Sequence, residues 1–381
     1  MKKKLKRLLI NLKYKDMKVI ISGGGTGGHI FPAVAIANAI KKKYSDCDIL
    51  FIGAKNRMEM EKVPQAGYKI EGLWISGLQR RLTFKNLSFP FKVISSTIKA
   101  LMIIKRFKPD IVIGVGGYAS GPTLRAATTL GYPTLIQEQN SYPGITNKLL
   151  AKKVDKICVA YDKMNRWFDE KKICFTGNPV RQNIVDIENK RDGAAVHFGL
   201  DKTKKTILVV GGSLGARTIN ESIAKGMSFF VENDIQLIWQ TGKNYFDKAK
   251  QEASGFSSNN IKIFDFIYEM DLAYSMADII VSRAGAIAIS ELCVIGKPTI
   301  LVPSPNVSED HQTKNAMALV NKNAGILVRD VESREMLIDQ LDMLLKDKDV
   351  QNILSDNIKK LGIRDADIRI LEVIEELLEK K

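Results

Sequence analysis

The segment MKVIISGGGTGGHIFPAVAIANAI (residues 17–40) decides the fold class of this 381-residue chain. Its pattern predicts a β-branched strand over 18–22, a glycine cluster, and a helix over about 32–43. Glycines at such a junction let the backbone approach an anionic group closely, and the helix N-terminus offers free N–H groups. The pattern returns at 205–227, KTILVVGGSLGARTINESIAKGM, so the sequence predicts two halves of similar architecture.

Short strand-like runs alternate with helical stretches along both halves. The runs lie at 48–53, 110–114 and 134–137, and then at 206–210, 237–240, 261–264, 279–282 and 299–302. This alternation predicts an α/β fold with two doubly wound parallel sheets, each covered by helices on both faces. The boundary is expected within 177–199, where Pro179 interrupts the pattern. An amphipathic helix is expected over 365–381.

The charge of the chain is unevenly distributed. Residues 1–180 carry 32 Lys and Arg against 12 Asp and Glu, whereas residues 181–381 carry 26 against 30. A strongly cationic half favours an anionic partner, either a nucleic acid or a membrane surface. No nucleic-acid recognition motif is found, but the charge alone does not choose between the two partners. No run reaches the roughly 18–20 apolar residues that span a bilayer, so peripheral contact is expected. The four cysteines lack metal-ligand spacing and are expected to be free core thiols.

Three further glycine-rich turns follow predicted strands, at 114–122, 211–215 and 283–286. Any one of them could be a tight turn, but four at strand-to-helix junctions favour a ligand site lined by backbone N–H groups. A nicotinamide dinucleotide would also need an acid at the end of the second strand, to bind its ribose. That strand ends in FIGA (51–54), without an acid, which argues against a dinucleotide.

Seven collinear motifs resemble those of the peptidoglycan N-acetylglucosaminyltransferases of glycosyltransferase family 28. They are GGGTGGHIFPA (23–33), GVGGYASGP (114–122), EQN (138–140), GNPVR (177–181), GGSLGAR (211–217), SRAGAIAISEL (282–292) and HQTKNA (311–316). The resemblance implies the GT-B architecture, two Rossmann-like domains facing across a cleft. It also implies a basic extension over 1–16, an acceptor and membrane-associating domain over 17–180, a UDP-sugar domain over 181–364, and a helix over 365–381 that packs back on the first domain.

The resemblance also implies which residues bind the donor, UDP-N-acetylglucosamine. In the second domain these are Arg181, Ser213, Ile267, Ala286, Ile287, Ala288, Ile289, Ser290, Glu291 and Gln312. Ser213 would donate to the pyrophosphate and Glu291 would accept from both ribose hydroxyls. Ile267 would pack near the uracil, although a plain core position is an open alternative. From the first domain, donor sugar and acceptor would meet Thr26, Gly27, Gly28 and Asn140.

The implied reaction is inverting transfer of N-acetylglucosamine to the 4-hydroxyl of N-acetylmuramic acid in lipid I, which gives lipid II. His29 is the candidate base, since a helix N-terminus would keep its imidazole neutral. Its alternative role is to orient the glycine loop. Arg181 and helix N-termini would stabilise the leaving UDP without a metal or cofactor. Gln137 departs from many members of the family, and Ala288 and His311 depart from some, so the contact at Ala288 is expected through its backbone.

The cationic half contains a candidate membrane surface that rests partly on the lipid substrate of the family. Its residues are Trp74, Leu78, Arg80, Arg81, Leu82, Phe84 and Lys85, followed by a helix-like stretch over 93–107. Apolar residues flanked by Lys and Arg suit anionic lipid, and an ordinary loop is the alternative. The expected location is the cytoplasmic face of the cell membrane, with cell-envelope or divisome proteins as further candidate partners. Two other functions stay open: another enzyme on the same architecture, such as a UDP-sugar 2-epimerase or a glycolipid synthase, and a non-catalytic scaffold.

Overall fold

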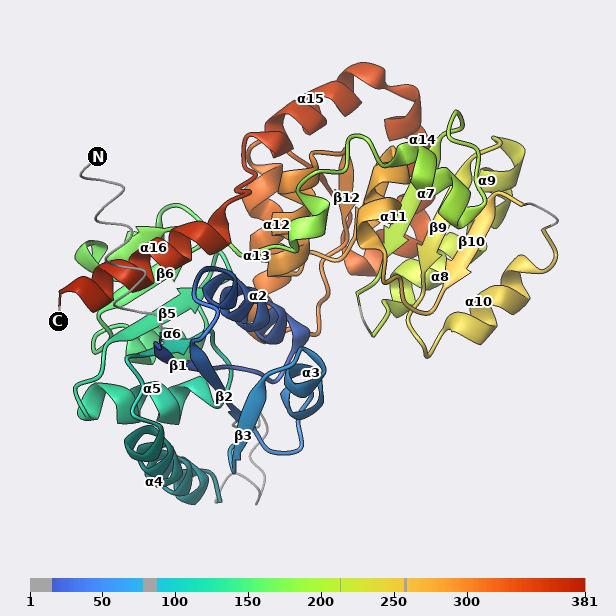
Figure 1. Ribbon diagram of the computed structural model, residues 1–381. Helices are drawn as coiled ribbons and strands as arrows, with labels where there is room; N and C mark the ends of the chain where they lie inside the picture. Colours follow the sequence, from blue (N-terminus) through green and yellow to red (C-terminus); the bar gives the residue numbers. More distant parts are fainter. Residues whose placement is uncertain (1–15, 78–87, 213, 257–258, 381) are drawn as a thin grey trace, which may run out of the picture. The chain divides into compact units, whose positions relative to one another are not determined.

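The computed structural model describes residues 16–77, 88–212, 214–256 and 259–380 (Figure 1). The chain forms two compact units. Unit 1 comprises the residues up to Pro179 together with those from Asp365 onward, and unit 2 is Val180–Arg364. None of the described helices is long and apolar enough to cross a membrane.

Unit 1 is built on a parallel sheet of seven strands in the order β3-β2-β1-β4-β5-β6-β7. Its central strands are buried on both faces, which is why they appear in the sequence as continuous apolar runs. The strands are β1 (Lys18–Ser22), β2 (Asp48–Ala54), β3 (Lys69–Leu73), β4 (Ile111–Gly114), β5 (Thr134–Glu138), β6 (Lys156–Val159) and β7 (Ile173–Phe175).

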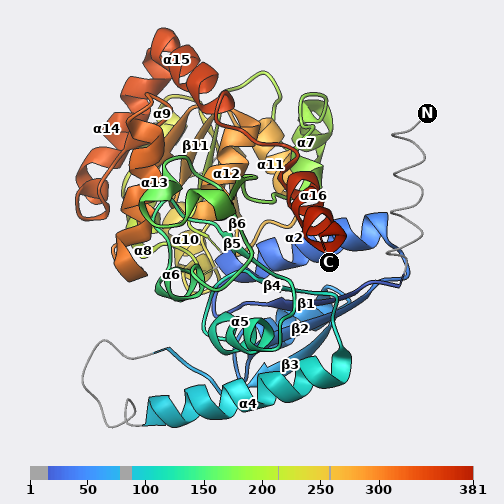
Figure 2. The same cartoon turned by 90° about the vertical axis from the view of Figure 1, so that its left-hand side faces the viewer.

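Helices cover both faces of this sheet (Figure 2). One face carries α2 (Gly27–Lys43), α3 (Glu59–Gln65) and the C-terminal α16 (Ala366–Glu379); the other carries α4 (Phe89–Phe107), α5 (Ser120–Thr129) and α6 (Ile145–Leu150). The apolar face of α16 packs on α2, and Glu375 of α16 accepts hydrogen bonds from Lys43 and from Tyr44 Oη, the latter at 2.7 Å. The last helix of the chain therefore completes the core of unit 1.

Unit 2 has a parallel six-stranded sheet in the order β10-β9-β8-β11-β12-β13. Its strands are β8 (Thr206–Val210), β9 (Gln236–Gln240), β10 (Ile261–Phe264), β11 (Ile279–Ser282), β12 (Thr299–Leu301) and β13 (Ile326–Leu327). Its helices are α7 (Arg191–Phe198), α8 (Arg217–Lys225), α9 (Met227–Glu232), α10 (Phe246–Ala253), α11 (Met270–Met276), α12 (Ala286–Ile295), α13 (His311–Val320), α14 (Ser333–Lys346) and α15 (Lys348–Lys359). The expected α/β class with two parallel sheets is confirmed.

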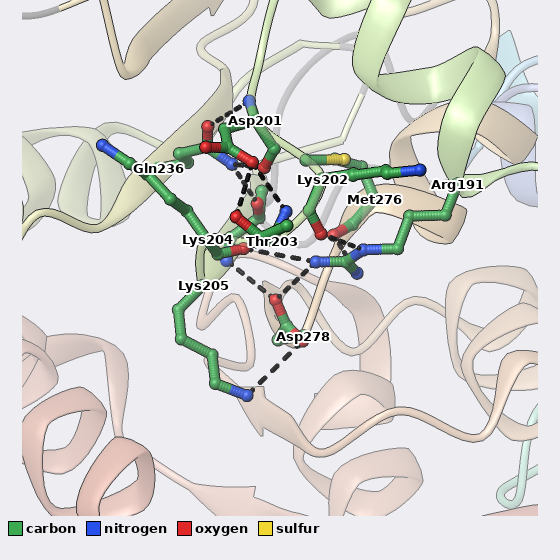
Figure 3. Close-up of polar contacts among 10 residues, drawn as sticks. Arg191, Asp201, Lys202, Thr203, Lys204, Lys205, Gln236, Met276 and Asp278 are labelled. Carbon is green, nitrogen blue, oxygen red and sulfur yellow. Dashed lines mark hydrogen bonds and ion pairs between the residues drawn. The ribbon is translucent and has the colours of Figure 1, made fainter.

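Arg191 fixes the edge of the unit 2 sheet at which the strands begin (Figure 3). Its guanidinium donates to the carbonyls of Lys202 at 2.9 Å, Met276 at 2.8 Å and Lys204 at 3.2 Å, and to Asp278 Oδ2 at 3.2 Å. Asp278 in turn accepts from the backbone N–H of Thr206 at 2.9 Å. One side chain thus ties the starts of α7, β8 and β11 together.

Several element boundaries differ from those predicted. Helix α2 begins at Gly27 rather than near 32, because Thr26 is extended and its carbonyl already accepts from the N–H groups of His29 and Ile30. Helix α4 begins at Phe89 rather than at 93, with proline in its first turn, where the missing N–H costs nothing. The strands β3, β6, β7 and β13 were not predicted: β7 and β13 have three and two residues, and β3 and β6 each begin with a lysine.

Candidate functional site

Two glycine loops meet at the carboxyl edge of the unit 1 sheet, because β1 and β4 are neighbours in it. A Cβ atom added to Gly117, whose φ is +83°, would lie 2.2 Å from the carbonyl oxygen of Gly24. Only glycine lets the two backbones approach so closely. The loops that the sequence singled out separately therefore form one surface.

His29 lies on this surface, in the first turn of α2. Its Nδ1 is 3.3 Å from Thr26 Oγ1, and a Cβ atom added to Gly116 would lie 2.9 Å from its Nε2. The imidazole therefore packs against the second glycine loop while its other nitrogen faces the threonine hydroxyl. Gly27 and Gly28, between the two polar residues, are the first two residues of the helix.

A buried carboxylate organises the next loop along the same edge. Glu138, the last residue of β5, accepts from Asn140 N at 3.0 Å, Asn140 Nδ2 at 3.1 Å, Gly144 N at 3.0 Å and Asn147 Nδ2 at 2.8 Å. Burial raises the pKa of Glu138, and these hydrogen bonds oppose the rise. Asn147 Oδ1 is buried and has no hydrogen-bond partner among the described residues. Sequence reasoning had singled out Asn140 alone here.

In unit 2, two of the expected donor-site residues form an ion pair. Arg181 Nε and Nη2 donate to Glu291 Oε1 and Oε2 at 2.8 and 3.2 Å, and Tyr274 Oη is 3.1 Å from Oε2. The side chain of Glu291 is 3% exposed and that of Arg181 48%. Burial and the charge of Glu291 raise the pKa of Tyr274 well above its usual value. Burial lowers the pKa of Arg181, but Glu291 outweighs that effect and the net shift is upward.

A glutamine at the end of β9 joins two loops of the same edge. Gln240 Nε2 donates to the carbonyl of Gly212 at 3.1 Å, and Gln240 Oε1 accepts from Ile267 N at 3.0 Å. Ile267 itself is only 2% exposed, so a ligand could reach little of its side chain in this conformation. Ser213, in the same glycine loop, lies outside the described residues. Neither Gln240 nor Tyr274 was predicted, because their partners come from distant elements.

The remaining expected residues of unit 2 lie at helix starts. Ala286, Ile287, Ala288, Ile289 and Ser290 form the first turns of α12, whose extended N-cap Gly285 offers no side chain to its free N–H groups. The hydroxyl of Ser290 donates back to the carbonyl of Ala286 at 3.0 Å. Gln312, in the first turn of α13, accepts from Ser304 N through Oε1 at 2.8 Å. An uncapped helix start without acidic residues suits an anion.

Part of the expected membrane surface can be located. Trp74 is 52% exposed, and Lys92 Nζ lies 5.7 Å from the centre of its ring. Leu78, Arg80, Arg81, Leu82, Phe84 and Lys85 lie outside the described residues. On α4, one stripe exposes Phe91, Ile94, Ile98 and Met102. The described residues contain no group of three or more His, Cys, Asp or Glu side chains that could hold a metal ion.

Two family models match this chain, and both describe glycosyltransferase family 28. Residues 19–159 match the glycosyltransferase family 28 N-terminal domain, and residues 206–370 match the glycosyltransferase family 28 C-terminal domain. A protein from Cytophaga hutchinsonii is 56% identical over 96% of this chain and 98% of its own length, and one from Flavobacterium psychrophilum is 52% identical over 96% and 99%. Both are named UDP-N-acetylglucosamine–N-acetylmuramyl-(pentapeptide) pyrophosphoryl-undecaprenol N-acetylglucosamine transferase.

Solved structures that match this chain include a transferase and an epimerase. The crystal structure of Acinetobacter baumannii MurG matches with a TM-score of 0.76 and 27% identity, over 94% of this chain and 99% of that one. A UDP-N-acetylglucosamine 2-epimerase from Neisseria meningitidis matches with a TM-score of 0.65 over 96% and 100%, but its identity is 16%, so that likeness concerns the fold alone.

Proposed function

The chain belongs to glycosyltransferase family 28, and from this premise we propose that it transfers N-acetylglucosamine from UDP-N-acetylglucosamine to lipid I, the N-acetylmuramyl-(pentapeptide) pyrophosphoryl-undecaprenol. The observation that carries the proposal is the 56% identity, over 96% of the chain, to a transferase of that name. We infer that the acceptor group is the 4-hydroxyl of N-acetylmuramic acid and that the product is lipid II.

We propose that unit 2 binds the donor at the carboxyl edge of its sheet. The uncapped start of α12 faces the pyrophosphate, and the loops joined by Gln240 hold the uridine. Glu291 already accepts three hydrogen bonds, whereas a carboxylate offers about four sites. Two ribose hydroxyls can bind it only if one present partner leaves. We propose that this partner is Arg181, because its side chain is half-exposed and can turn to the nucleotide without being buried unpaired.

We propose that unit 1 binds the acceptor around His29. The imidazole takes the proton of the 4-hydroxyl while that oxygen forms the new bond to C1 of the sugar. The bond from C1 to the β-phosphate oxygen breaks, and its electron pair leaves with UDP. Attack opposite to the leaving group inverts the configuration at C1. Asn140, held by Glu138, can orient the sugar hydroxyls.

We propose that unit 1 meets the membrane surface through α4 and Trp74. Phe91, Ile94, Ile98 and Met102 recur at intervals of three and four residues, so they form one apolar stripe along the helix. Lys105 and Arg106 lie in its last turn, and residues 1–180 as a whole are strongly cationic. Such a combination suits the interface of an anionic bilayer.

A transfer assay tests the proposal. The protein is incubated with UDP-N-acetylglucosamine and a short-chain lipid I analogue, and the products are identified by mass spectrometry. We expect a disaccharide lipid and an equal amount of UDP. His29→Ala should reduce turnover and leave UDP affinity unchanged. Absence of the disaccharide lipid would overturn the proposal, and consumption of the donor without acceptor would indicate an epimerase instead.

A further inference from the structure

Glu59 is a buried carboxylate beneath the first glycine loop. It is the first residue of α3, five residues after the end of β2, and it is 1% exposed. Its Oε2 accepts from Gly25 N at 2.8 Å, and its Oε1 accepts from Ala54 N at 2.9 Å. The carboxylate thus joins the loop after β1 to the loop after β2. Sequence reasoning found no acid at the end of β2, and this one reaches the same place from the next helix.

The backbone is shaped around this side chain. A Cβ atom added to Gly24, whose φ is +147°, would lie 2.2 Å from Glu59 Oε1. A Cβ atom added to Gly53 would lie 2.6 Å from Glu59 Cγ. A side chain at either position would displace the carboxylate from the two N–H groups that it binds. Both glycines therefore keep room for Glu59.

We propose that Glu59 is a positioning residue of the transfer reaction, an internal anion that holds the first glycine loop in its working conformation. The inference rests on the proposed function. In a dinucleotide-binding loop, the backbone N–H groups face a pyrophosphate and an acid after β2 binds the ribose. Here the carboxylate of Glu59 accepts a hydrogen bond from the N–H group of Gly25 and is therefore not available to bind a ribose. The first glycine loop is thus held in its working conformation before any nucleotide binds.

The effect reaches His29 through a short run of backbone. Gly25 precedes Thr26, the N-cap of α2, and the carbonyl of Thr26 accepts from the N–H groups of His29 at 3.1 Å and Ile30 at 3.2 Å. If Glu59 no longer binds Gly25, the residue before the N-cap of α2 loses its hydrogen bond, and the start of α2 and the imidazole of His29 are held less firmly. A misplacement of about 1 Å at a reacting group can cost about 100-fold in rate.

Three variants test this role. Glu59→Gln keeps one acceptor but turns an NH₂ group toward one of the two N–H groups, so we expect kcat to fall about 10- to 100-fold while UDP affinity changes less than about twofold. Glu59→Ala empties the site, and we expect acetate to restore part of kcat, whereas chloride at equal ionic strength does not. Asp155→Asn is the matched control. Asp155 also binds a backbone N–H group of unit 1, that of Thr134 at 2.7 Å, but at the opposite edge of the sheet, and kcat should be unchanged.

A readout independent of activity separates this inference from the proposed function. The chain has three histidines, so their imidazole signals can be assigned in nitrogen-15 NMR spectra. We expect Glu59→Gln to shift the signals of His29 and to leave those of His197 and His311, both in unit 2, in place. Failure of the wild type to form product would refute the proposed function alone. An unshifted His29 signal, a wild-type kcat in Glu59→Gln, or no rescue of Glu59→Ala by acetate would overturn the role of Glu59.

Discussion

Replacing Glu291 by glutamine tests how unit 2 holds the ribose of the donor. The glutamine keeps the shape of the side chain but offers one acceptor oxygen where the carboxylate offered two. A hydrogen bond to a charged group contributes about 1.5–3 kcal/mol. If one ribose hydroxyl loses such a bond, UDP should bind about 10- to 100-fold more weakly, because each 1.4 kcal/mol is tenfold.

The same change also affects stability, and the size of that effect follows from burial. Removing one partner of a fully buried ion pair costs about 3–5 kcal/mol. Arg181 is 48% exposed on its side chain and can return to water, so solvent screening reduces the cost. We expect the free energy of unfolding of Glu291→Gln to fall by about 1–2 kcal/mol, which leaves a folded protein for binding measurements.

Calorimetry with UDP and 2′-deoxy-UDP gives the decisive comparison. The wild type should bind UDP about tenfold or more tightly than the deoxy ligand, and Glu291→Gln should show a smaller difference between the two. Glu221→Gln serves as control, since Glu221 also pairs with two arginines, Arg217 and Arg334, but joins α8 to α14. If Glu291→Gln still discriminated between the two ligands as the wild type does, the carboxylate could not be the ribose acceptor.

Three further predictions concern stability and membrane binding. Arg191→Lys should lower the free energy of unfolding by about 1–3 kcal/mol in urea titrations without changing UDP affinity, because an ammonium has three donors on one nitrogen, whereas the guanidinium makes four hydrogen bonds from three nitrogens. Burial raises the pKa of Glu138, so the folded state binds the proton of this carboxyl more tightly than the unfolded state does. The free energy of unfolding should therefore fall as the pH rises from about 4.5, the ordinary pKa of a glutamate, to the pKa of Glu138 in the folded state. Glu138→Gln should lack this slope. Phe91→Ser with Met102→Ser should weaken sedimentation with anionic vesicles by about tenfold or more, whereas Met343→Ser, equally exposed but on unit 2, should have no effect.

The sequence predicted those parts of the fold that depend on local pattern. β1, β8, β10 and β11 begin and end where their β-branched runs do, and the glycine clusters fall at strand ends. The strands that were missed are short, and β3 (KIEGL) mixes charged and apolar residues, so that neither length nor alternation distinguishes it from a loop. Such strands exist because a neighbouring strand pairs with them, and pairing is not visible in local sequence.

The residues of the candidate site also fall into those that local sequence identifies and those that it does not. The glycine loops, His29 and Asn140 were accessible because motif and position identify them. Glu59, Tyr274 and Gln240 act by reaching a different element: Glu59 reaches the loop after β1, Tyr274 reaches Glu291 on α12, and Gln240 reaches two loops at once. A buried polar side chain must find a partner, but which partner it finds is decided by the tertiary fold.

The glycine loop after β1 in unit 1 and the one after β8 in unit 2 share one sequence pattern but bind different partners. In unit 1 the backbone N–H of Gly25 binds a carboxylate of the protein itself. In unit 2 the partner of the corresponding loop is the neutral amide of Gln240, which binds a carbonyl, and no carboxylate hydrogen-bonds residues 211–215 in the part of that loop that is described. Because a fixed carboxylate repels a phosphate, the backbone N–H groups of the loop in unit 2 suit a phosphate better than the N–H group of Gly25 does. The two loops thus differ in the side chain that each of them binds, a carboxylate in unit 1 and an amide in unit 2, even though both share the same strand, glycine and helix pattern.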